Sequence, residues 1–290
     1  MRNLKVTEKY NNKKLINFLT ENFDGLSLST IYKALRKKDI KINNIRVSEN
    51  CLLRKGDDVT IYIHDNFLFK QYNIPIVYQD ENIVVFNKPA GLEYDTLTKY
   101  VSNTLSNNNV NFLQPCHRLD RNTSGLILFA KNQKSLNELL VAFKNHKIIK
   151  HYICVVYGIP AYKSQKLEAF LFKDSKKSQV YISDFQKKGY KKIITSYNLL
   201  KSNKKKNISL LDITLETGRT HQIRAHLAHT GFPIIGDGKY GNNKINKQFN
   251  LYTQQLSSYS LSFNLSPDSH LFYLNNHTIT QNKIPFTDLL

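Results

Sequence analysis

The sequence predicts an α+β protein built from two domains. Residues 13–63 combine a helix-like stretch with short strands separated by turns. The stretch 64–73 has no sustained hydrophobic period and runs up to Pro75, whereas 76–290 carries several short buried strands and an amphipathic helix. A length of 290 residues allows two domains of ordinary size. We therefore expect a small domain at 1–63, a linker at 64–75 and a larger domain at 76–290.

The small domain is expected to contain a basic helix in the stretch LSTIYKALRKK. Its apolar stripe consists of Leu28, Ile31, Tyr32 and Leu35, and the opposite side carries Lys33, Arg36 and Lys37. Turn signals at Asn43-Asn44 and at 55–58 then separate short strands, the last of them at 59–63. A solvated helix face is one interpretation of the three cations, and contact with RNA phosphates is the other.

The larger domain is predicted from alternation and turn signals. Its expected elements are buried strands at 83–86 and 125–130, an Asn-rich loop at 103–111, a helix at 135–143, strand-and-loop material at 163–207, a strand at 208–216 and a helix that Thr220 caps and that ends at Gly231. In HYICVVYG, alternation places Tyr152, Cys154 and Val156 on one strand face. The lysine clusters within 163–207 are expected to be exposed loops.

The charge of the chain indicates a polyanionic partner. Lys and Arg number 42 against 22 Asp and Glu, so the formal net charge is +20. Each phosphate that such a surface neutralises releases a condensed counterion, which makes nucleic acid the leading partner class. No lipidation signal, apolar run of membrane length or signal-peptide pattern is present, so we expect a cytoplasmic protein without membrane contact. The excess charge also favours a monomer.

Neither a disulfide framework nor a metal site is expected. The three cysteines, Cys51, Cys116 and Cys154, are scattered without CxxC spacing. Three histidines, His221, His226 and His229, raise the question of a metal, but His221 is off the helical spacing of the other two, and no HExxH pattern accompanies them. Nucleotide-binding glycine loops and a nucleophile elbow are missing as well. We expect no cofactor.

One carboxylate stands out in CHRLDRNTSGLILFAKN, where Asp120 lies between Arg118 and Arg121. If both arginines face it, their charges keep the carboxylate ionised, which suits a nucleophile, a weak base or an ion-pair partner rather than a general acid. A structural ion pair is the simpler interpretation. A second cluster, TGRTHQIRAHLAHTG, places Arg224 on a packed helix, where a guanidinium can hold a carboxylate in two hydrogen bonds.

These two stretches resemble conserved motifs of the RluA family of RNA pseudouridine synthases. HRLDRNTSGLILFAKN is similar to the family's catalytic motif, and ETGRTHQIRAHLAHTGFPIIGDGKYG to its later arginine motif. NIVVFNKPAGL and KHYICVVYG match two further blocks, and residues 13–63 resemble the S4 RNA-binding domain. The resemblance implies a catalytic domain on a mixed, mainly antiparallel sheet, preceded by a small α+β S4 domain.

The family resemblance also implies roles for individual residues. Asp120 would be the catalytic aspartate, Tyr152 the tyrosine against the target base, and Arg224 the arginine that pairs with the aspartate. Arg121 would take the flipped nucleotide's former place or hold its phosphate, and the other residues expected to bind substrate are Arg118, Arg219 and His221. In the S4 domain the expected phosphate contacts are Lys33, Arg36 and Lys37.

The chain departs from the family pattern at two places. Asn122 stands where the family commonly has Asp, and Leu256-Ser257-Ser258 stands where members often carry Leu-His-Ala. The second change puts the C-terminal region in doubt rather than the catalytic centre. The function expected from the resemblance is isomerisation of uridine to pseudouridine in RNA, most similar to the branch acting on large-subunit ribosomal RNA. Transfer RNA is the alternative substrate, and a non-catalytic RNA-binding ribosome-assembly factor is the rival function.

Overall fold

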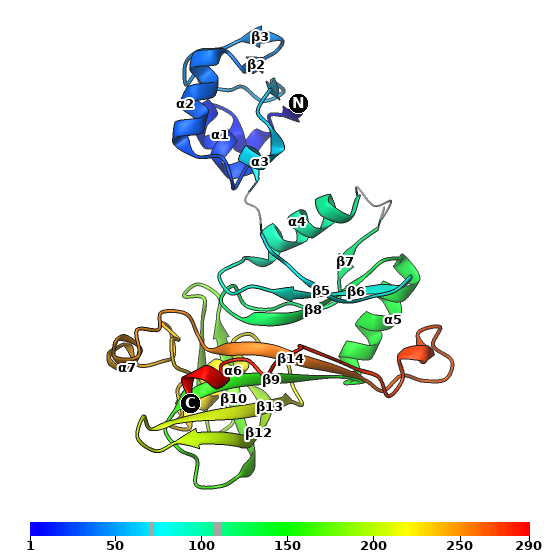
Figure 1. The fold of residues 1–290 in the computed structure, drawn as a ribbon, viewed down its shortest axis with the longest axis vertical. Coiled ribbons are helices and arrows are strands. Elements are labelled where there is room, and N and C mark those ends of the chain that lie inside the picture. The colour runs from blue at the N-terminus through cyan, green and yellow to red at the C-terminus, as the bar shows by residue number, and fades with distance from the viewer. Residues whose placement is uncertain (70–71, 107–111) are drawn as a thin grey trace. The chain divides into compact units, whose positions relative to one another are not determined.

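The chain divides into two compact units. In the computed structural model, which describes residues 1–69, 72–106 and 112–290, the units are Met1–Asn73 and Ile74–Leu290 (Figure 1). Each unit has its own hydrophobic core. Within the described ranges no helix is both long and apolar enough to cross a membrane.

The first unit is a four-stranded antiparallel sheet with helices packed against it. The strand order is β1 (Arg2–Lys5), β4 (Asp58–Ile61), β2 (Ile40–Ile42) and β3 (Ile45–Arg46). The helical elements of this unit are η1 (Glu8–Tyr10), α1 (Leu15–Asn22), α2 (Leu28–Lys37) and α3 (Asp65–Leu68). Apolar residues of α1, α2 and β4 share one core, in which Leu19, Ile31 and Ile61 are fully buried.

Helix α2 carries the predicted cations on its outside, but its buried stripe is narrower than predicted. Ile31 and Leu35 are buried, whereas Leu28 and Tyr32 are 55% and 52% exposed, so the prediction was wrong for these two residues. The stripe facing the core consists of 31, 34 and 35, a spacing that one helical face accommodates. Lys33, Arg36 and Lys37 are all exposed.

The boundary between the units falls inside the linker predicted at 64–75, near its end. Residues 65–68 form α3, Leu68 is fully buried in the first core, and its carbonyl accepts a hydrogen bond from the N–H of Gly25. The first unit therefore extends to Asn73. A single helical turn is too short to show a hydrophobic period, which explains why the sequence pattern did not reveal it.

The second unit is built on one large sheet, which in the described part of the chain has eleven strands. Its order is β11 (Gln179–Ser183), β10 (Ser164–Asp174), β12 (Lys191–Asn203), β13 (Ile208–Leu215), β9 (Ile148–Tyr157), β14 (Leu256–Phe263), β8 (Ser124–Ala130), β6 (Ile83–Lys88) and β5 (Ile76–Gln79), with β15 (Thr278–Thr280) on β14 and β7 (Gln114–Pro115) on β8. Only the β14–β8 pair is parallel among these strands. The predicted mixed, mainly antiparallel sheet is confirmed.

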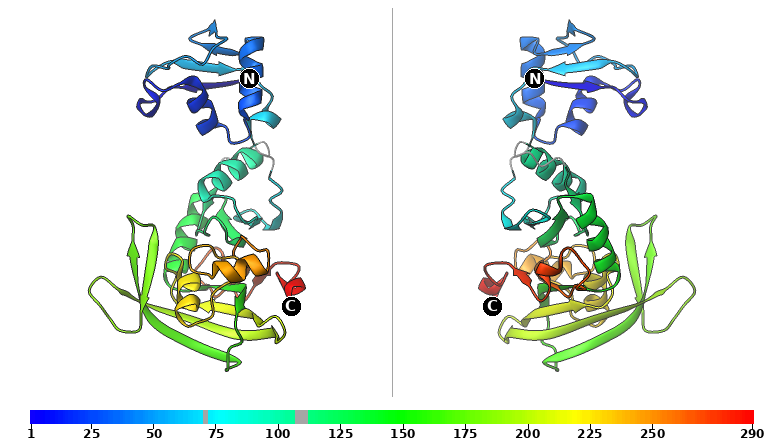
Figure 2. Two further views of the ribbon diagram at one scale, coloured as in Figure 1. Left: turned by 90° about the vertical axis from the view of Figure 1, so that its left-hand side faces the viewer. Right: turned by 90° about the vertical axis from the view of Figure 1, so that its right-hand side faces the viewer.

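The described residues of this unit form four α-helices beside the sheet: α4 (Tyr94–Ser106), α5 (Gln133–Lys144), α6 (Gln222–His229) and α7 (Asn243–Gln248). Short 3₁₀ turns, η2 (Phe272–Leu274) and η3 (Thr287–Leu289), lie in the C-terminal region. Leu139 of α5 is buried in a core with Leu126 and Leu128 of β8. Figure 2 shows β10 and β11 (light green) at one edge of the sheet.

The Asn-rich loop predicted at 103–111 overlaps a helix. Residues 103–106 belong to α4, and the remainder, 107–111, lies outside the described residues. The doubtful Leu256-Ser257-Ser258 stretch opens β14, where Ser257 and Ser258 are buried at the centre of the sheet. The departure from the family pattern therefore replaces buried positions and leaves the strand itself intact.

Candidate active site

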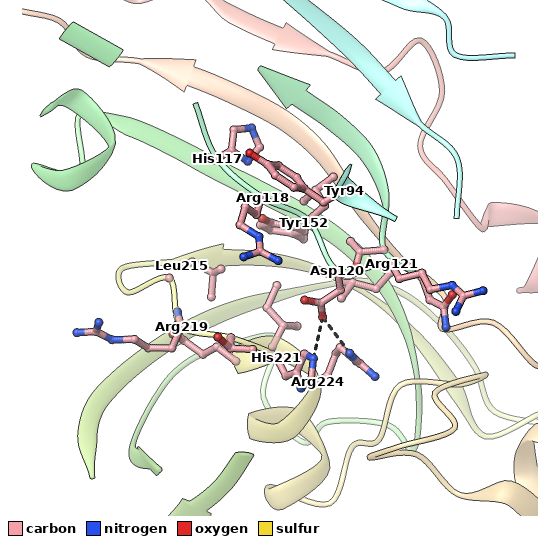
Figure 3. Close-up of a pocket in the computed structure, with 18 of the residues that line it drawn as sticks. Tyr94, His117, Arg118, Asp120, Arg121, Tyr152, Leu215, Arg219, His221 and Arg224 are labelled. Atoms are coloured by element: carbon pink, nitrogen blue, oxygen red, sulfur yellow. Dashed lines mark hydrogen bonds and ion pairs between the residues drawn. The ribbon is translucent and has the colours of Figure 1, made fainter. Parts of the chain in front are cut away.

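The residues singled out in the larger domain meet at one cleft of the second unit. The cleft has a volume of about 680 Å³, which suits a nucleotide-sized ligand. Most of its wall comes from three parts of the chain: the stretch 117–123 before β8, residues Lys150 and Tyr152 of β9, and the stretch 218–224 that leads into α6 (Figure 3). The remaining lining residues are 93–95, Lys173, Leu215 and Leu256. The sheet places β9 next to β13 and β14, which brings these segments together.

The carboxylate of Asp120 pairs with an arginine from a distant part of the sequence. Asp120 lies in a turn closed by the N–H of Thr123, which donates to the Asp120 carbonyl at 3.1 Å. Its Oδ2 accepts a hydrogen bond from Nη1 of Arg224 at 2.9 Å (Figure 3). The Asp120 side chain remains 28% exposed, so the carboxylate is oriented by Arg224 and still open to the cleft.

The two arginines that flank Asp120 in sequence point elsewhere. The guanidinium of Arg118 lies over the ring of Tyr94, 5.0 Å from its centroid. Arg121 donates from Nε to the carbonyl of Gly91 at 3.2 Å, and its Nη1 lies 3.4 Å from the Glu93 carboxylate. In the described part of the chain neither forms an ion pair with Asp120. The arrangement considered from the sequence, in which both arginines face Asp120, is therefore not found, although both line the cleft.

A second carboxylate, which the sequence reasoning missed, holds Arg224 in place. Nε and Nη2 of Arg224 donate to the two oxygens of Asp237 at 2.7 and 3.0 Å. Burial by itself raises the pKa of Asp237, but the hydrogen bonds and charge of Arg224, with the N–H groups of Lys239 and Tyr240, outweigh it and hold the pKa below 3.8. Asp237 is the lone acidic residue of IIGDGKYG, and that is the signal that could have found it.

Tyr152 presents its ring to the cleft from the middle of β9. The side chain is only 6% exposed and lies opposite Ser258 of β14 and Ile213 of β13. Burial, with a smaller contribution from the Asp120 charge, raises the pKa of Tyr152 far above its usual 10. The phenol therefore stays neutral at physiological pH, and Tyr152 offers a flat apolar face with a hydroxyl at its end.

Helix α6 begins differently from the prediction. Its N-cap is His221, in the left-handed region at φ 52°, and Thr220 forms no side-chain cap. The side chain of Gln222 instead accepts from the N–H of Arg219 at 3.1 Å and from the hydroxyl of Thr217 at 2.9 Å. The helix ends at His229, two residues before Gly231, whose φ of +88° suits a glycine at a helix end.

The three histidines of this region have separate partners. His221 is bonded through Nδ1 to the Tyr240 hydroxyl at 2.8 Å, and its Nε2 lies 3.9 Å from Asp120. His226 is buried against Thr195, and His229 pairs with Asp184. Burial lowers the pKa of His221, so it is neutral in the cleft. Across the described residues, His, Cys, Asp and Glu side chains form no group of three or more that could hold a metal ion.

Comparison with known proteins identifies the family. The protein-family model described as RNA pseudouridylate synthase matches residues 82–229 of the sequence. The chain belongs to the RNA pseudouridylate synthase family. This membership confirms the resemblance drawn from the motifs of the larger domain and the predicted enzyme class, while the S4 resemblance of residues 13–63 stays a prediction.

Relatives from bacteria cover nearly the whole chain. A ribosomal large subunit pseudouridine synthase C of Buchnera aphidicola is 32% identical over 281 residues, covering 90% of this chain and 88% of that protein. An uncharacterized RNA pseudouridine synthase of Mycoplasma capricolum is also 32% identical and covers 96% of each chain. The solved structure of human RNA pseudouridylate synthase domain containing 1 shares the fold, with a TM-score of 0.58 at 23% identity over 75% of this chain and 92% of that one.

A buried lysine of this pseudouridine synthase fold, also missed by the sequence reasoning, supports the Asp120 turn. Nζ of Lys88 donates to the carbonyls of Pro89, Leu92 and Arg121 at 3.0, 2.9 and 2.9 Å. The side chain is fully buried, and burial lowers the pKa of Lys88 to about 8. The lysine therefore ties the Lys-Pro-Ala-Gly turn to the residue that follows Asp120.

The other end of the Asp120 turn is fixed to β14. Thr123 accepts a hydrogen bond from the buried amide of Gln254 at 2.6 Å. Gly125 has a φ of +107°, and a Cβ there would lie 2.2 Å from the carbonyl oxygen of Ser258. Only glycine allows this approach, so the turn that carries Asp120 is held on both sides.

Proposed function

We propose that this protein isomerises specific uridines of large-subunit ribosomal RNA to pseudouridine, with Asp120 as the reacting carboxylate. The observation that carries the proposal is the bridge Asp120–Arg224–Asp237 at the base of the cleft. Arg224 orients a single partly exposed carboxylate toward the space that a nucleotide would fill. Tyr152 lies in the same cleft, where a ring can stack on the target base.

The reaction needs a carboxylate and a shielded cleft. It breaks the N1–C1′ bond of uridine, rotates the uracil and forms the C5–C1′ bond. The proton on C5 is lost and N1 gains a proton, so the composition of the nucleotide is unchanged. Asp120 either attacks C1′ or C6, or assists departure and deprotonation of the base. The target base must leave its stack at a cost of a few kcal/mol, and stacking on Tyr152 together with contacts from Arg118, Arg121, Arg219 and His221 offsets this cost.

The ribosomal substrate is supported by the relatives. Several bacterial relatives carry the name ribosomal large subunit pseudouridine synthase C. The net charge of +20 suits a large RNA, and the exposed cations Lys33, Arg36 and Lys37 of α2 would bind its phosphates as an S4 domain does. We infer that the protein acts as a monomer in the cytoplasm. Transfer RNA remains the alternative substrate.

The deciding experiment compares the parent with Asp120→Asn. Because the side chain is partly exposed and Arg224 keeps Asp237, the variant should melt close to the parent and bind RNA equally well. Turnover on large-subunit ribosomal RNA transcripts should vanish, since an amide lacks the anionic oxygen. Appreciable pseudouridine from a folded variant would remove Asp120 from the reaction. A parent that binds these transcripts without modifying them would favour the non-catalytic assembly factor, and product on transfer RNA alone would favour the alternative substrate.

A further inference from the structure

Lys150 places an ammonium group in the wall of the cleft. It lies two residues before Tyr152 on β9, and successive odd or even positions of a strand face the same side. Both side chains line the cleft. Lys150 was not among the residues expected to bind substrate.

The ammonium of Lys150 lies near an aromatic ring and near a glycine. Its Nζ is 5.3 Å from the centroid of the Phe143 ring of α5. A Cβ added at Gly218 would be 3.5 Å from the same nitrogen, an ordinary van der Waals distance. The end of the lysine therefore lies close to the backbone of Gly218. Unlike Lys88, whose Nζ donates to three carbonyls, the ammonium of Lys150 forms no hydrogen bond or ion pair with any described residue.

This unpaired position is unfavourable in the free protein. Lys150 is half-buried, and burial lowers its pKa. Its neighbour His117 offers no counter-charge, because burial, together with the charge of Lys150, lowers the His117 pKa to about 3. The carboxylate of Asp120 in the same cleft is paired with Arg224. Lys150 therefore lies where an incoming anion would meet a cation that lacks a partner.

Three further cations of the cleft share this condition. Arg118, Lys173 and Arg219 line the cleft, and within the described ranges none of them has a carboxylate partner. By contrast, Arg224 is occupied by Asp120 and Asp237, and Arg121 by Glu93. The cleft is thus divided into a paired set beside the reacting carboxylate and an unpaired set that can accept negative charge.

We propose that the ammonium of Lys150 binds a phosphodiester oxygen of the RNA adjacent to the nucleotide that stacks on Tyr152. The proposal deepens the proposed function and rests on it for the identity of the polyanion. An ammonium is a compact point charge with three donors, which a phosphate oxygen matches. The phosphodiester supplies the counter-charge and the hydrogen bond that the free protein lacks at this position. Lys150 contacts the substrate but takes no part in bond making.

The test uses the full chain with Lys150→Met and Lys150→Arg. Affinity for a large-subunit ribosomal RNA transcript is measured by titration at several salt concentrations. Lys150→Met should weaken binding about ten- to hundredfold and reduce the slope of log affinity against log salt by about 0.7 to 0.9. Lys150→Arg should recover most of both. Because the lost charge is unpaired in the free protein, the Met variant should melt at or above the parent temperature.

Turnover at saturating RNA separates this role from others. It should stay within a few-fold of the parent in both variants, while the apparent KM rises in Lys150→Met. If turnover collapses at unchanged affinity and arginine does not rescue it, the amine takes part in proton transfer and the proposal is overturned. A clear fall in melting temperature in both variants would assign Lys150 to folding and likewise overturn it.

A matched control is Lys192→Met. Lys192 is exposed, pairs with Glu168 and lies outside the cleft, so its loss should change the salt slope and the apparent KM less than the loss of Lys150. Equal effects of the two variants would show only a general dependence on net charge and would contradict a site at Lys150. The parent protein could make no pseudouridine while Lys150→Met still lowers the salt slope as expected. That result would contradict the proposed function and would still support the phosphate contact.

Discussion

Asp237 accepts two hydrogen bonds from Arg224, at 2.7 and 3.0 Å, through a carboxylate that is fully withdrawn from solvent. This geometry fixes the plane of the guanidinium and leaves Nη1 free to meet Asp120. Two parallel hydrogen bonds to a carboxylate constrain orientation more strongly than one. The position of the Asp120 carboxylate therefore depends on a residue that does not itself line the cleft.

We predict that Asp237→Asn lowers both stability and turnover. The buried guanidinium of Arg224 would lose its counter-charge, which costs about 3 kcal/mol when a buried pair is broken from one side. Urea unfolding and a turnover assay check this. Asp184→Asn, which removes the exposed partner of His229, is the control and should change neither. Parent-like stability and activity in Asp237→Asn would contradict the bridging role.

The ion pair between Arg224 and Asp237 predicts that the protein loses stability in acid. The pKa of Asp237 is below 3.8 in the folded protein, so the unfolded chain binds the proton more readily. The stabilisation is fully present above about pH 4 and is lost as the pH falls through the folded pKa. Unfolding measured from pH 6 to pH 3 should therefore show a steeper decline for the parent than for Asp237→Asn. Parallel curves would rule this linkage out.

Tyr152 is predicted to act mainly through its ring. Tyr152→Phe keeps the stacking face, so RNA affinity should stay near that of the parent. Tyr152→Leu removes it, and affinity should fall about tenfold or more, since stacking of one base on an aromatic ring contributes about 1–3 kcal/mol. Titration of both variants checks this, with the exposed Tyr252→Leu as control. A leucine variant that binds as tightly as the parent would exclude base stacking at this position.

The lowered pKa of Lys88 predicts that the free energy of unfolding rises in mild alkali. Its pKa is about 8 in the folded protein against 10.5 when unperturbed, so between these values the folded state has released a proton that the unfolded chain still holds. Stability should rise by about 3 kcal/mol across this range relative to Lys88→Met. Urea unfolding at pH 7.5 and pH 10 tests it. The exposed Lys283→Met should follow the parent, and an equal pH response in Lys88→Met would contradict the assignment.

The basic helix of the first unit is predicted to bind RNA. Replacing Lys33, Arg36 and Lys37 together by Met should weaken affinity and reduce the salt slope by about 2 to 3, because all three side chains are exposed and their charges are dispensable for folding. The melting temperature should not change. An unaltered salt slope would show that these three residues form a solvated helix face that does not bind RNA.

The amino-acid sequence by itself determined the elements and the class of this protein. Alternation and buried runs located β6, β8, β9 and β13 to within a few residues, because period and turn chemistry are local properties. The motifs around Asp120, Tyr152 and Arg224 predicted the enzyme class, which family membership confirms. Local patterns failed where tertiary contacts decide, as at Leu28 and Tyr32 of α2, which lie on an apolar stripe and yet face solvent.

Only the tertiary structure decided which charges meet. The sequence places Arg118 and Arg121 beside Asp120, but the turn between β7 and β8 directs them to Tyr94 and Glu93. The partner of Asp120 comes instead from α6, and the carboxylate that fixes it from the turn after α6. Neighbours along the chain need not be neighbours in space, because side-chain direction follows from backbone conformation and sheet register. Those two properties placed Asp237 behind Arg224 and left the ammonium of Lys150 unpaired in the cleft wall.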